Sequence, residues 1–201
     1  MSRWQEYYQT LSLSDFLGNL FGQREFLEEI VKLKPTKLLE VGAGSGGLSI
    51  FLSQMGFEVT ASDRDEAILK IIRENNERFG GRLMRVVLAD SFKLPFAGGE
   101  FDLVFHQGLL EHFSDLGVKQ LIEEQLRVAP QVLFSVPNQN YPRRDLGDER
   151  LLNGASWRRI LRDFVVVWQK NYSPKVFPRF YLPRALIQQM ILVKRRDHES
   201  H

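Results

Sequence analysis

The chain has 201 residues and a net charge of only +2, with 43% hydrophobic and 26% charged residues. This composition is typical of a globular protein with a hydrophobic core, and so small a positive charge does not indicate a nucleic-acid-binding surface. The absence of cysteine excludes disulfides, thiolate metal ligands and a cysteine nucleophile. Because there is no signal-peptide pattern and no apolar run of membrane-spanning length, we expect a cytoplasmic protein.

Residues 1–34 are predicted to be helical. Apolar and aromatic residues recur there at three- and four-residue spacing, with Ser14 as the expected N-cap and Pro35 as the expected stop. We expect these helices to cover one edge of the core. Tyr8 is an exception, because a tyrosine hydroxyl needs a polar partner and is better placed at the rim of a site.

From residue 37 onward, strands and helices alternate, and the strands are almost continuously apolar. This pattern predicts an α/β fold with a mostly parallel, doubly wound, Rossmann-like sheet that has helices on both faces. We expect a single domain over residues 1–201, with an N-terminal helical cap (1–34) and a core of about seven strands (37–194). The predicted strands are 38–41, 57–63, 82–90, 101–107, 131–137, 165–169 and 190–194, and helices are expected at 48–55, 65–79, around 118–126 and at 156–164.

The glycine-rich stretch 37–49, KLLEVGAGSGGLS, is the main functional signal. A buried strand runs into a tight turn and then into a helix, whose free amide groups face whatever lies over the turn. Glycine suits such a turn because it tolerates a positive φ angle and lets a ligand approach the backbone. The pattern indicates a nucleotide-type site, and Gly42, Gly44 and Gly47 alone fit the fingerprint of dinucleotide enzymes.

Polar residues also follow the next three strands, at the edge of a parallel sheet where ligands bind. Asp63 lies about 20 residues beyond the first glycine, the spacing of a carboxylate that binds ribose hydroxyls. Asp90 and Ser91 end the third strand and are followed by LPF and FDLVF, and the fourth strand ends in HQGLLEHF. A dinucleotide enzyme explains Asp63 but leaves Asp90 and the LEH segment without a role.

The chain resembles the class I S-adenosylmethionine-dependent methyltransferases, in particular the type 11-like group. The resemblance rests on Glu40 with Gly42, Gly44 and Gly46, followed in order by these later segments. The resemblance covers about residues 4–194 and is strongest over 37–113. It implies that S-adenosylmethionine binds and that S-adenosylhomocysteine is the product. It also implies the cofactor-binding residues: the glycines and Glu40 for the methionine moiety, Asp63 for the ribose, Arg64 beside the adenine, Asp90 and Ser91 for the base, and His106 and Gln107 at the methionine end.

His112 is the predicted proton acceptor, because it follows the fourth strand and histidine titrates near neutrality. Glu111 is expected to order this segment, and Tyr8 to cover the cofactor or contact the acceptor. No metal site is expected, because two of the four histidines lie in the C-terminal tail and none is paired with a credible acidic triad.

We expect a small-molecule acceptor for the methyl group, methylated on oxygen, nitrogen or carbon. Methyltransferases that act on amino groups of nucleic acids resemble one another in an N-P-P-Y-like segment after the fourth strand, and this chain has HQGL there. Acidic residues are interspersed among the arginine clusters, which argues against a surface that binds phosphates. The N-terminal helices and the loop 138–153 are expected to form the acceptor pocket, in a monomer or a homodimer. An NAD-dependent oxidoreductase, a non-catalytic S-adenosylmethionine-binding module, and RNA or protein acceptors remain as alternatives.

Overall fold

A computed structural model describes residues 3–8, 10–80, 84–142, 147–173 and 186–196. Seven strands form one sheet in the order β3-β2-β1-β4-β5-β7-β6. The first five strands pair in parallel, whereas β7 is antiparallel to both β5 and β6. The strands are β1 (Lys37–Val41), β2 (Glu58–Asp63), β3 (Arg85–Leu88), β4 (Leu103–Gln107), β5 (Gln131–Pro137), β6 (Val165–Tyr172) and β7 (Gln188–Lys194).

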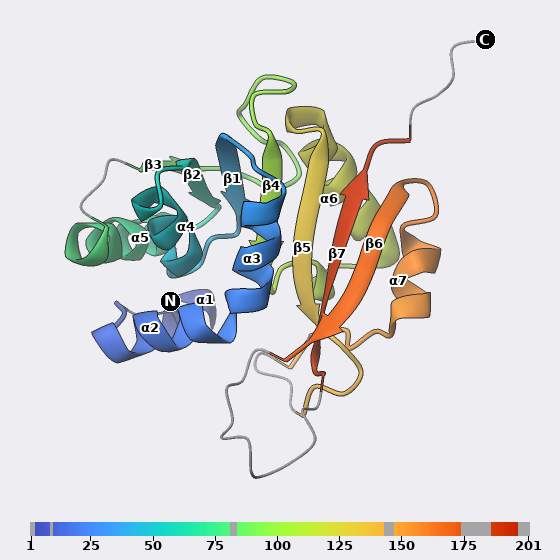
Figure 1. Cartoon of the computed structure of the whole chain (residues 1–201), viewed down its shortest axis with the longest axis horizontal. Helices are drawn as coiled ribbons and strands as arrows, with labels where there is room; N and C mark the ends of the chain where they lie inside the picture. Colours follow the sequence, from blue (N-terminus) through green and yellow to red (C-terminus); the bar gives the residue numbers. More distant parts are fainter. Residues whose placement is uncertain (1–2, 9, 81–83, 143–146, 174–185, 197–201) are drawn as a thin grey trace.

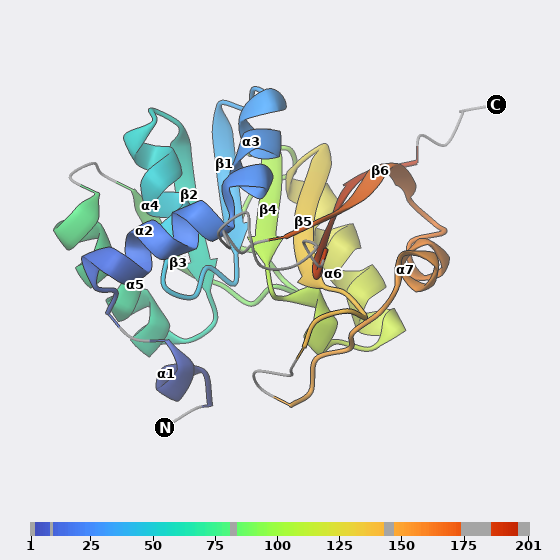
Figure 2. The same cartoon turned by 60° about the horizontal axis from the view of Figure 1, so that its bottom comes forward.

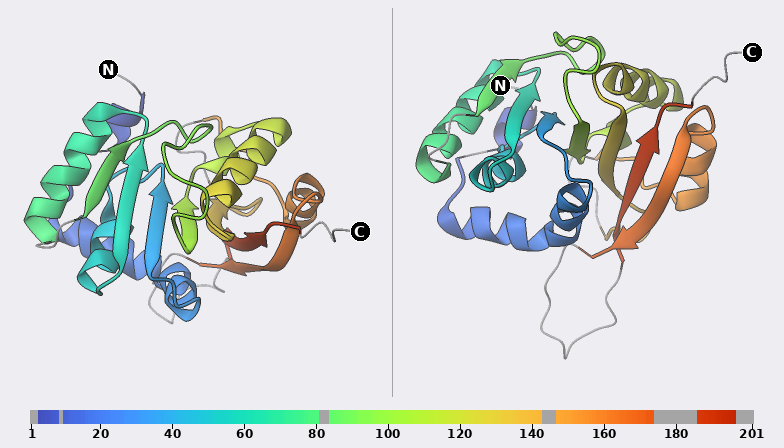
Figure 3. Two further views of the ribbon diagram at one scale, coloured as in Figure 1. Left: turned by 90° about the horizontal axis from the view of Figure 1, so that it is seen from above. Right: turned by 45° about the horizontal axis from the view of Figure 1, so that its top comes forward.

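Helices cover both faces of this sheet, as predicted (Figures 1 and 3). On one face, helices α3, α4 and α5 pack on the apolar residues of β1 and β2, and on the other α6 and α7 pack on β4 and β5. The helices are α1 (Arg3–Tyr7), α2 (Leu13–Gly22), α3 (Arg24–Lys32), α4 (Gly47–Gln54), α5 (Glu66–Phe79), α6 (Asp115–Val128) and α7 (Gly154–Ile160), with the 3-10 turn η1 (Leu110–His112) after β4.

The N-terminal segment forms three helices: α1 and α2 lie near the glycine turn, whereas α3 runs along β1 and β4 on one face of the sheet (Figure 2). The prediction of Ser14 as N-cap is wrong, because Ser12 caps α2. The Ser12 hydroxyl accepts from the Asp15 amide, and the Asp15 carboxylate accepts from the Ser12 amide, so the two residues form a capping box. This box starts α2 two residues earlier than expected and separates it from α1.

The helices after β2 and β4 begin at side-chain caps that their sequences supply. The Asp65 carboxylate accepts from the Ala67 amide at the start of α5, and the Ser114 hydroxyl accepts from the Gly117 amide at the start of α6. These caps fix the residues just before them, including Asp63 and His112, at the carboxyl edge of the sheet. None of the helices in the described part of the chain is long and apolar enough to cross a membrane. The single-domain layout over 1–201 stays a prediction.

Candidate active site at the carboxyl edge of the sheet

The glycine turn after β1 has the backbone that the sequence predicted. Gly42, Gly44 and Gly46 all have positive φ angles, of 68°, 54° and 75°. The Gly42 and Ala43 amides donate to the Ser62 carbonyl at 2.9 and 3.0 Å, which ties the turn to the end of β2. A Cβ atom on Gly44 would lie only 2.5 Å from Cζ of Tyr8. The turn therefore requires glycine both for its backbone conformation and for the close approach of another group.

Glu40, the fourth residue of β1, forms the floor of the cavity above this turn. Its side chain is buried, with 4% of its surface exposed, and its carboxylate accepts from the Ser49 hydroxyl at 2.5 Å. Burial raises the pKa of Glu40 to about 7, and the bond from Ser49 only partly opposes this rise. A carboxylate held in this way is a strong acceptor for a positively charged group in the cavity.

Asp63 lies at the end of β2, next to the turn. Its carboxylate accepts from the Asp65 amide at 3.1 Å. Burial raises the pKa of Asp63 from its ordinary value, and the nearby backbone amides of residues 44, 64 and 65 oppose the rise. Asp63 and Arg64 line a compartment of about 220 Å³ together with Ala89 and Ser91 from the loop after β3. Glu40, the turn and these strand-end residues therefore meet at one cavity.

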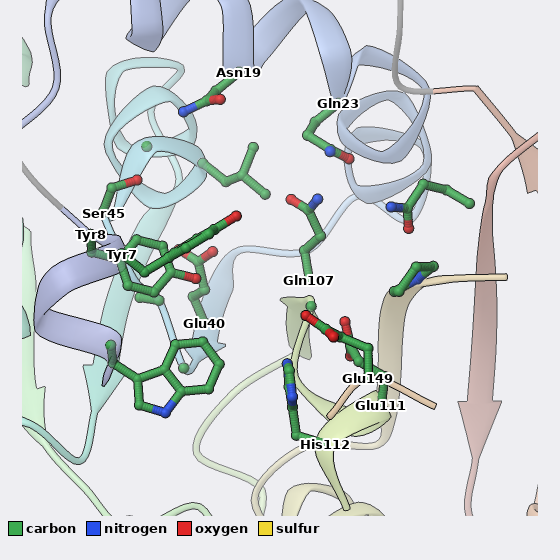
Figure 4. Close-up of a pocket in the computed structure, with 18 of the residues that line it drawn as sticks. Tyr7, Tyr8, Asn19, Gln23, Glu40, Ser45, Gln107, Glu111, His112 and Glu149 are labelled. Atoms are coloured by element: carbon green, nitrogen blue, oxygen red, sulfur yellow. The ribbon is translucent and has the colours of Figure 1, made fainter. Parts of the chain in front are cut away.

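The second compartment, of about 440 Å³, adjoins the first and lies over Glu40 and the glycine turn (Figure 4). Five residues line both compartments, so the two are parts of one site: Trp4, Tyr8, Gly42, Gly108 and His112. The total volume is of the size that holds a cofactor or a small ligand. The wall opposite the turn comes from η1, the end of β5, the start of β7 and the loop after residue 138.

Tyr8 lies where the two compartments meet. Its ring stacks on Trp4, with ring centroids 6.1 Å apart, and covers Gly44. Burial is the main reason why the pKa of its hydroxyl is raised above the ordinary value, and nearby Tyr7, Asp63 and Glu111 add to this effect. Tyr8 therefore stays protonated near neutral pH and acts as a hydrogen-bond donor or a lid, not as a base.

His112 also borders both compartments. Its Nδ1 lies 2.8 Å from Oδ1 of Asp148, and the Trp4 ring meets the imidazole edge-on at 5.1 Å between ring centroids. The fold brings Asp148 to His112 from 36 residues away in the sequence, and the absence of a metal site stays a prediction. The hydrogen bond fixes the orientation of the imidazole at the boundary between the compartments.

Glu111 and Glu149 form an acidic wall that the sequence did not predict. Both side chains are buried, with 3% and 6% of their surface exposed. Burial raises the pKa of Glu111 to about 8, and the neighbouring Glu149 and Asp148 add to the rise. The Arg150 amide donates to the Glu111 carbonyl at 2.9 Å, which joins the backbone of this segment to the loop after β5, and the ordering role of the Glu111 side chain stays a prediction.

Comparison with known proteins agrees with this geometry. Residues 38–131 match the family model described as a methyltransferase domain. The chain is 34% identical over 119 residues to ubiquinone biosynthesis O-methyltransferase of Azotobacter vinelandii, covering 57% of this chain and 50% of that protein. It is 26% identical over 106 residues to a protein-L-isoaspartate O-methyltransferase of Bradyrhizobium, covering 52% and 49%. The chain thus spans about half the length of the curated relatives it matches.

Solved structures show the same fold. A protein from Pyrococcus horikoshii superposes with a TM-score of 0.71 at 18% identity, over 94% of this chain and 95% of that one. Magnesium protoporphyrin IX methyltransferase from Synechocystis, solved with bound S-adenosylmethionine, superposes with a TM-score of 0.65 at 19% identity, over 96% and 90%. Residues 38–131, just under half of the chain, are therefore similar to a methyltransferase domain, as the sequence led us to expect. The doubly wound fold expected from the sequence is confirmed.

The fold brings most of the predicted site residues to one cavity. Gly44 lies directly beneath the Tyr8 ring, and Gly46 packs against Ile72. Asp90 lines neither compartment: it is exposed, and its Oδ1 accepts from the Phe92 amide at 2.9 Å, so it shapes its own loop. The predicted residues that line the cavity are Tyr8, Glu40, Gly42, Asp63, Arg64, Ser91, Gln107 and His112.

The prediction that His106 lines the cofactor site is wrong. His106 is fully buried, and its ring stacks on Phe134 of β5 at 5.5 Å between centroids, under α6. Successive side chains on a strand point to opposite faces, so with Gln107 at the cavity, His106 must face the hydrophobic core. The sequence analysis assigned both His106 and Gln107 to the site, but adjacent residues of a strand face opposite sides, so only Gln107 reaches the cavity.

His106 should make the folded state sensitive to acid. Burial lowers its pKa to about 3, and the nearby Gln125 side chain opposes this only in part, whereas the unfolded chain has the ordinary value of 6.5. The unfolded state therefore binds more protons, and the stabilisation present above pH 6.5 is lost as the pH falls toward 3. We expect the loss from pH 7 to pH 5 to be smaller in His106→Leu than in the native chain by roughly 2 kcal/mol. Urea unfolding at both pH values measures this, and equal losses would contradict it.

Proposed function

We propose that this chain is an S-adenosylmethionine-dependent methyltransferase that acts on a small-molecule acceptor. The observation that carries the proposal is the meeting of the glycine turn, Glu40 and Asp63 at one cavity, with a second compartment beside it. S-adenosylmethionine fits this donor set, because buried carboxylates suit its ribose hydroxyls and its positive charges. The solved Synechocystis relative carries this cofactor, which supports the same assignment here.

Each part of the cavity then has a role. Asp63 binds the ribose, with Arg64 and Ser91 beside the adenine, while Glu40 and the turn hold the methionine end. When bound, the sulfonium supplies a methyl group that is already activated for transfer. The chain's own contribution is to orient the acceptor and exclude water, and positioning of this kind supplies much of a rate enhancement. We assign His112 and Tyr8, which border both compartments, to the contact with the acceptor.

Small-molecule acceptors are favoured because the second compartment is a cavity of about 440 Å³ and not an extended surface. Of the similar proteins named above, ubiquinone biosynthesis O-methyltransferase and magnesium protoporphyrin IX methyltransferase support this class of acceptor, whereas protein-L-isoaspartate O-methyltransferase has a protein acceptor in its name. The cytoplasmic location and the monomeric or homodimeric state stay predictions.

Asp63→Ala tests the cofactor assignment. We expect the native chain to bind S-adenosylhomocysteine in isothermal titration calorimetry, and the variant to bind it about 10- to 100-fold more weakly, because charged hydrogen bonds to the ribose are lost. Glu58→Ala, at the exposed start of the same strand β2, is the control and should bind normally. Binding of NAD, with no binding of S-adenosylmethionine or S-adenosylhomocysteine, would overturn the proposal. It would indicate that the glycine turn binds a dinucleotide.

A further inference from the structure

The acceptor side of the cavity is acidic and aromatic. Figure 4 shows Glu111 and Glu149 next to one another, across the cavity from Tyr7 and Tyr8. Four carboxylates line the larger compartment, and no lysine or arginine does so among the residues that the structure describes: the four are Asp15, Glu40, Glu111 and Glu149. The pKa values of Glu40 and Glu111 are raised to about 7 and 8, so a cation bound in this compartment favours their ionised forms, whereas an anion is repelled.

Glu111 is the critical member of this wall. Its Oε2 is buried and has no hydrogen-bond partner within the described residues. A buried carboxylate oxygen is costly unless a donor or a cation pairs with it. Arg150, from the adjoining loop, does not meet this need through its side chain, because its guanidinium donates to the Phe113 carbonyl and the Asp115 carboxylate. Glu111 lines the compartment, so a small rotation of its carboxyl group would pair this oxygen with a ligand there.

The aromatic residues of the same compartment suit an organic cation. Trp4, Tyr7 and Tyr141 all line it, and aromatic faces attract ammonium groups through the negative charge of the ring face. The methionine end of the cofactor, near Glu40 and the turn, accounts for only part of this negative surface. Glu111 and Glu149 lie on the opposite wall, next to His112 and Pro137.

We propose that the methyl acceptor is an amine, which enters as its ammonium form and is held by the carboxylates of Glu111 and Glu149. This inference rests on the methyltransferase function proposed above. Before the nitrogen can act as a nucleophile, the ammonium must lose one proton, and Glu111 Oε2 accepts it, giving a neutral amine and a neutral carboxylic acid. In this proposal Glu111, and not His112, is the proton acceptor, and His112 contacts the methyl acceptor.

A divalent metal ion is the competing occupant. Donor atoms of His112, Asp148 and Glu149 lie within 4.8 Å of one another, close to the roughly 4.4 Å limit for two ligands about 2.2 Å from one ion. An ion at that position leaves Glu111 Oε2 without a partner, and the Asp148 carboxylate already engages His112. The unpaired Glu111 oxygen and the aromatic wall are explained by an ammonium group, so the amine is favoured.

The experiment compares ligands that differ only in charge. Benzylamine, 2-phenylethylamine and cyclohexylmethylamine, with the alcohol and the carboxylic acid of each skeleton, are titrated into the protein saturated with S-adenosylhomocysteine. We expect the amines to bind at least 10-fold more tightly than the alcohols and the carboxylates most weakly. Glu111→Gln and Glu149→Gln should each reduce amine affinity at least 10-fold without changing S-adenosylhomocysteine affinity. Glu123→Gln, on the exposed face of α6, is the matched control.

Three results would overturn the amine assignment: no binding by any amine, tighter binding of an alcohol or carboxylate, or amine affinity that is unchanged in both variants. The site would be a metal site if no amine binds, if the protein binds Mn²⁺ or Zn²⁺, and if Asp148→Asn abolishes that metal binding. Circular dichroism confirms that each variant is folded. Absence of S-adenosylhomocysteine binding in the native chain is a separate failure, of the methyltransferase proposal itself.

Discussion

Gly44→Val is expected to weaken S-adenosylhomocysteine binding at least 100-fold. The φ angle of Gly44 is +54°, a conformation that costs an L-residue about 1–2 kcal/mol and a β-branched one more. The new Cβ would lie 2.5 Å from the Tyr8 ring, and the two γ-methyl groups would project into the space above the turn. Isothermal titration calorimetry measures the affinity, and circular dichroism shows whether the variant is folded.

Gly99→Val is the control that distinguishes the two effects of Gly44→Val, which are strain in the backbone and blocking of the site. Gly99 has a similar φ angle of +69°, but a Cβ there meets nothing within 4 Å, and Gly99 lies outside the cavity lining. We expect this control to lose about 1–2 kcal/mol of unfolding free energy and to keep native affinity for S-adenosylhomocysteine. Native affinity in Gly44→Val would show that the ligand does not lie over the glycine turn.

Much of the cofactor side could be predicted because it depends on short stretches of sequence. The glycines fix the turn through their own φ preferences, and Glu40 and Asp63 follow at the ends of adjacent parallel strands. In a parallel sheet those ends meet at one edge, so sequence order alone brings the residues together. The same reasoning failed for His106, because the end of a strand was treated as one position although successive residues face opposite ways.

The acceptor side could not be predicted because it depends on long-range contacts. Asp148 pairs with His112, which lies 36 residues earlier in the sequence, and Glu149 lies close enough to Glu111 to raise its pKa. The loop that brings Asp148 and Glu149 there has no hydrophobic periodicity from which its position could be predicted. The polar loop 138–153 was expected to border the pocket, but nothing in its sequence showed which of its acidic residues would be buried. Only the tertiary fold distinguishes Glu149, which is buried, from exposed Asp148.

Trp157→Ala is expected to cost about 3–5 kcal/mol of unfolding free energy, the usual range for a large aromatic residue removed from a core. Trp157 is fully buried on α7, and its ring packs on Phe134 of β5 at 5.4 Å between centroids. Urea unfolding monitored by circular dichroism gives this value. Trp168→Ala on β6, where the ring is only partly buried, is the control and should cost less.

The same substitution should also affect the two halves of the site unequally. Leu152 and Asn153 join the acidic loop to α7: the Leu152 carbonyl accepts from Gln189 of β7, and the Asn153 side chain caps the helix. Loosening α7 therefore displaces Glu149, whereas Asp63 and the glycine turn lie on the other half of the sheet. We expect the folded variant to keep its affinity for S-adenosylhomocysteine while its affinity for 2-phenylethylamine falls. Equal losses of both affinities would show that the two compartments are not held by separate parts of the fold.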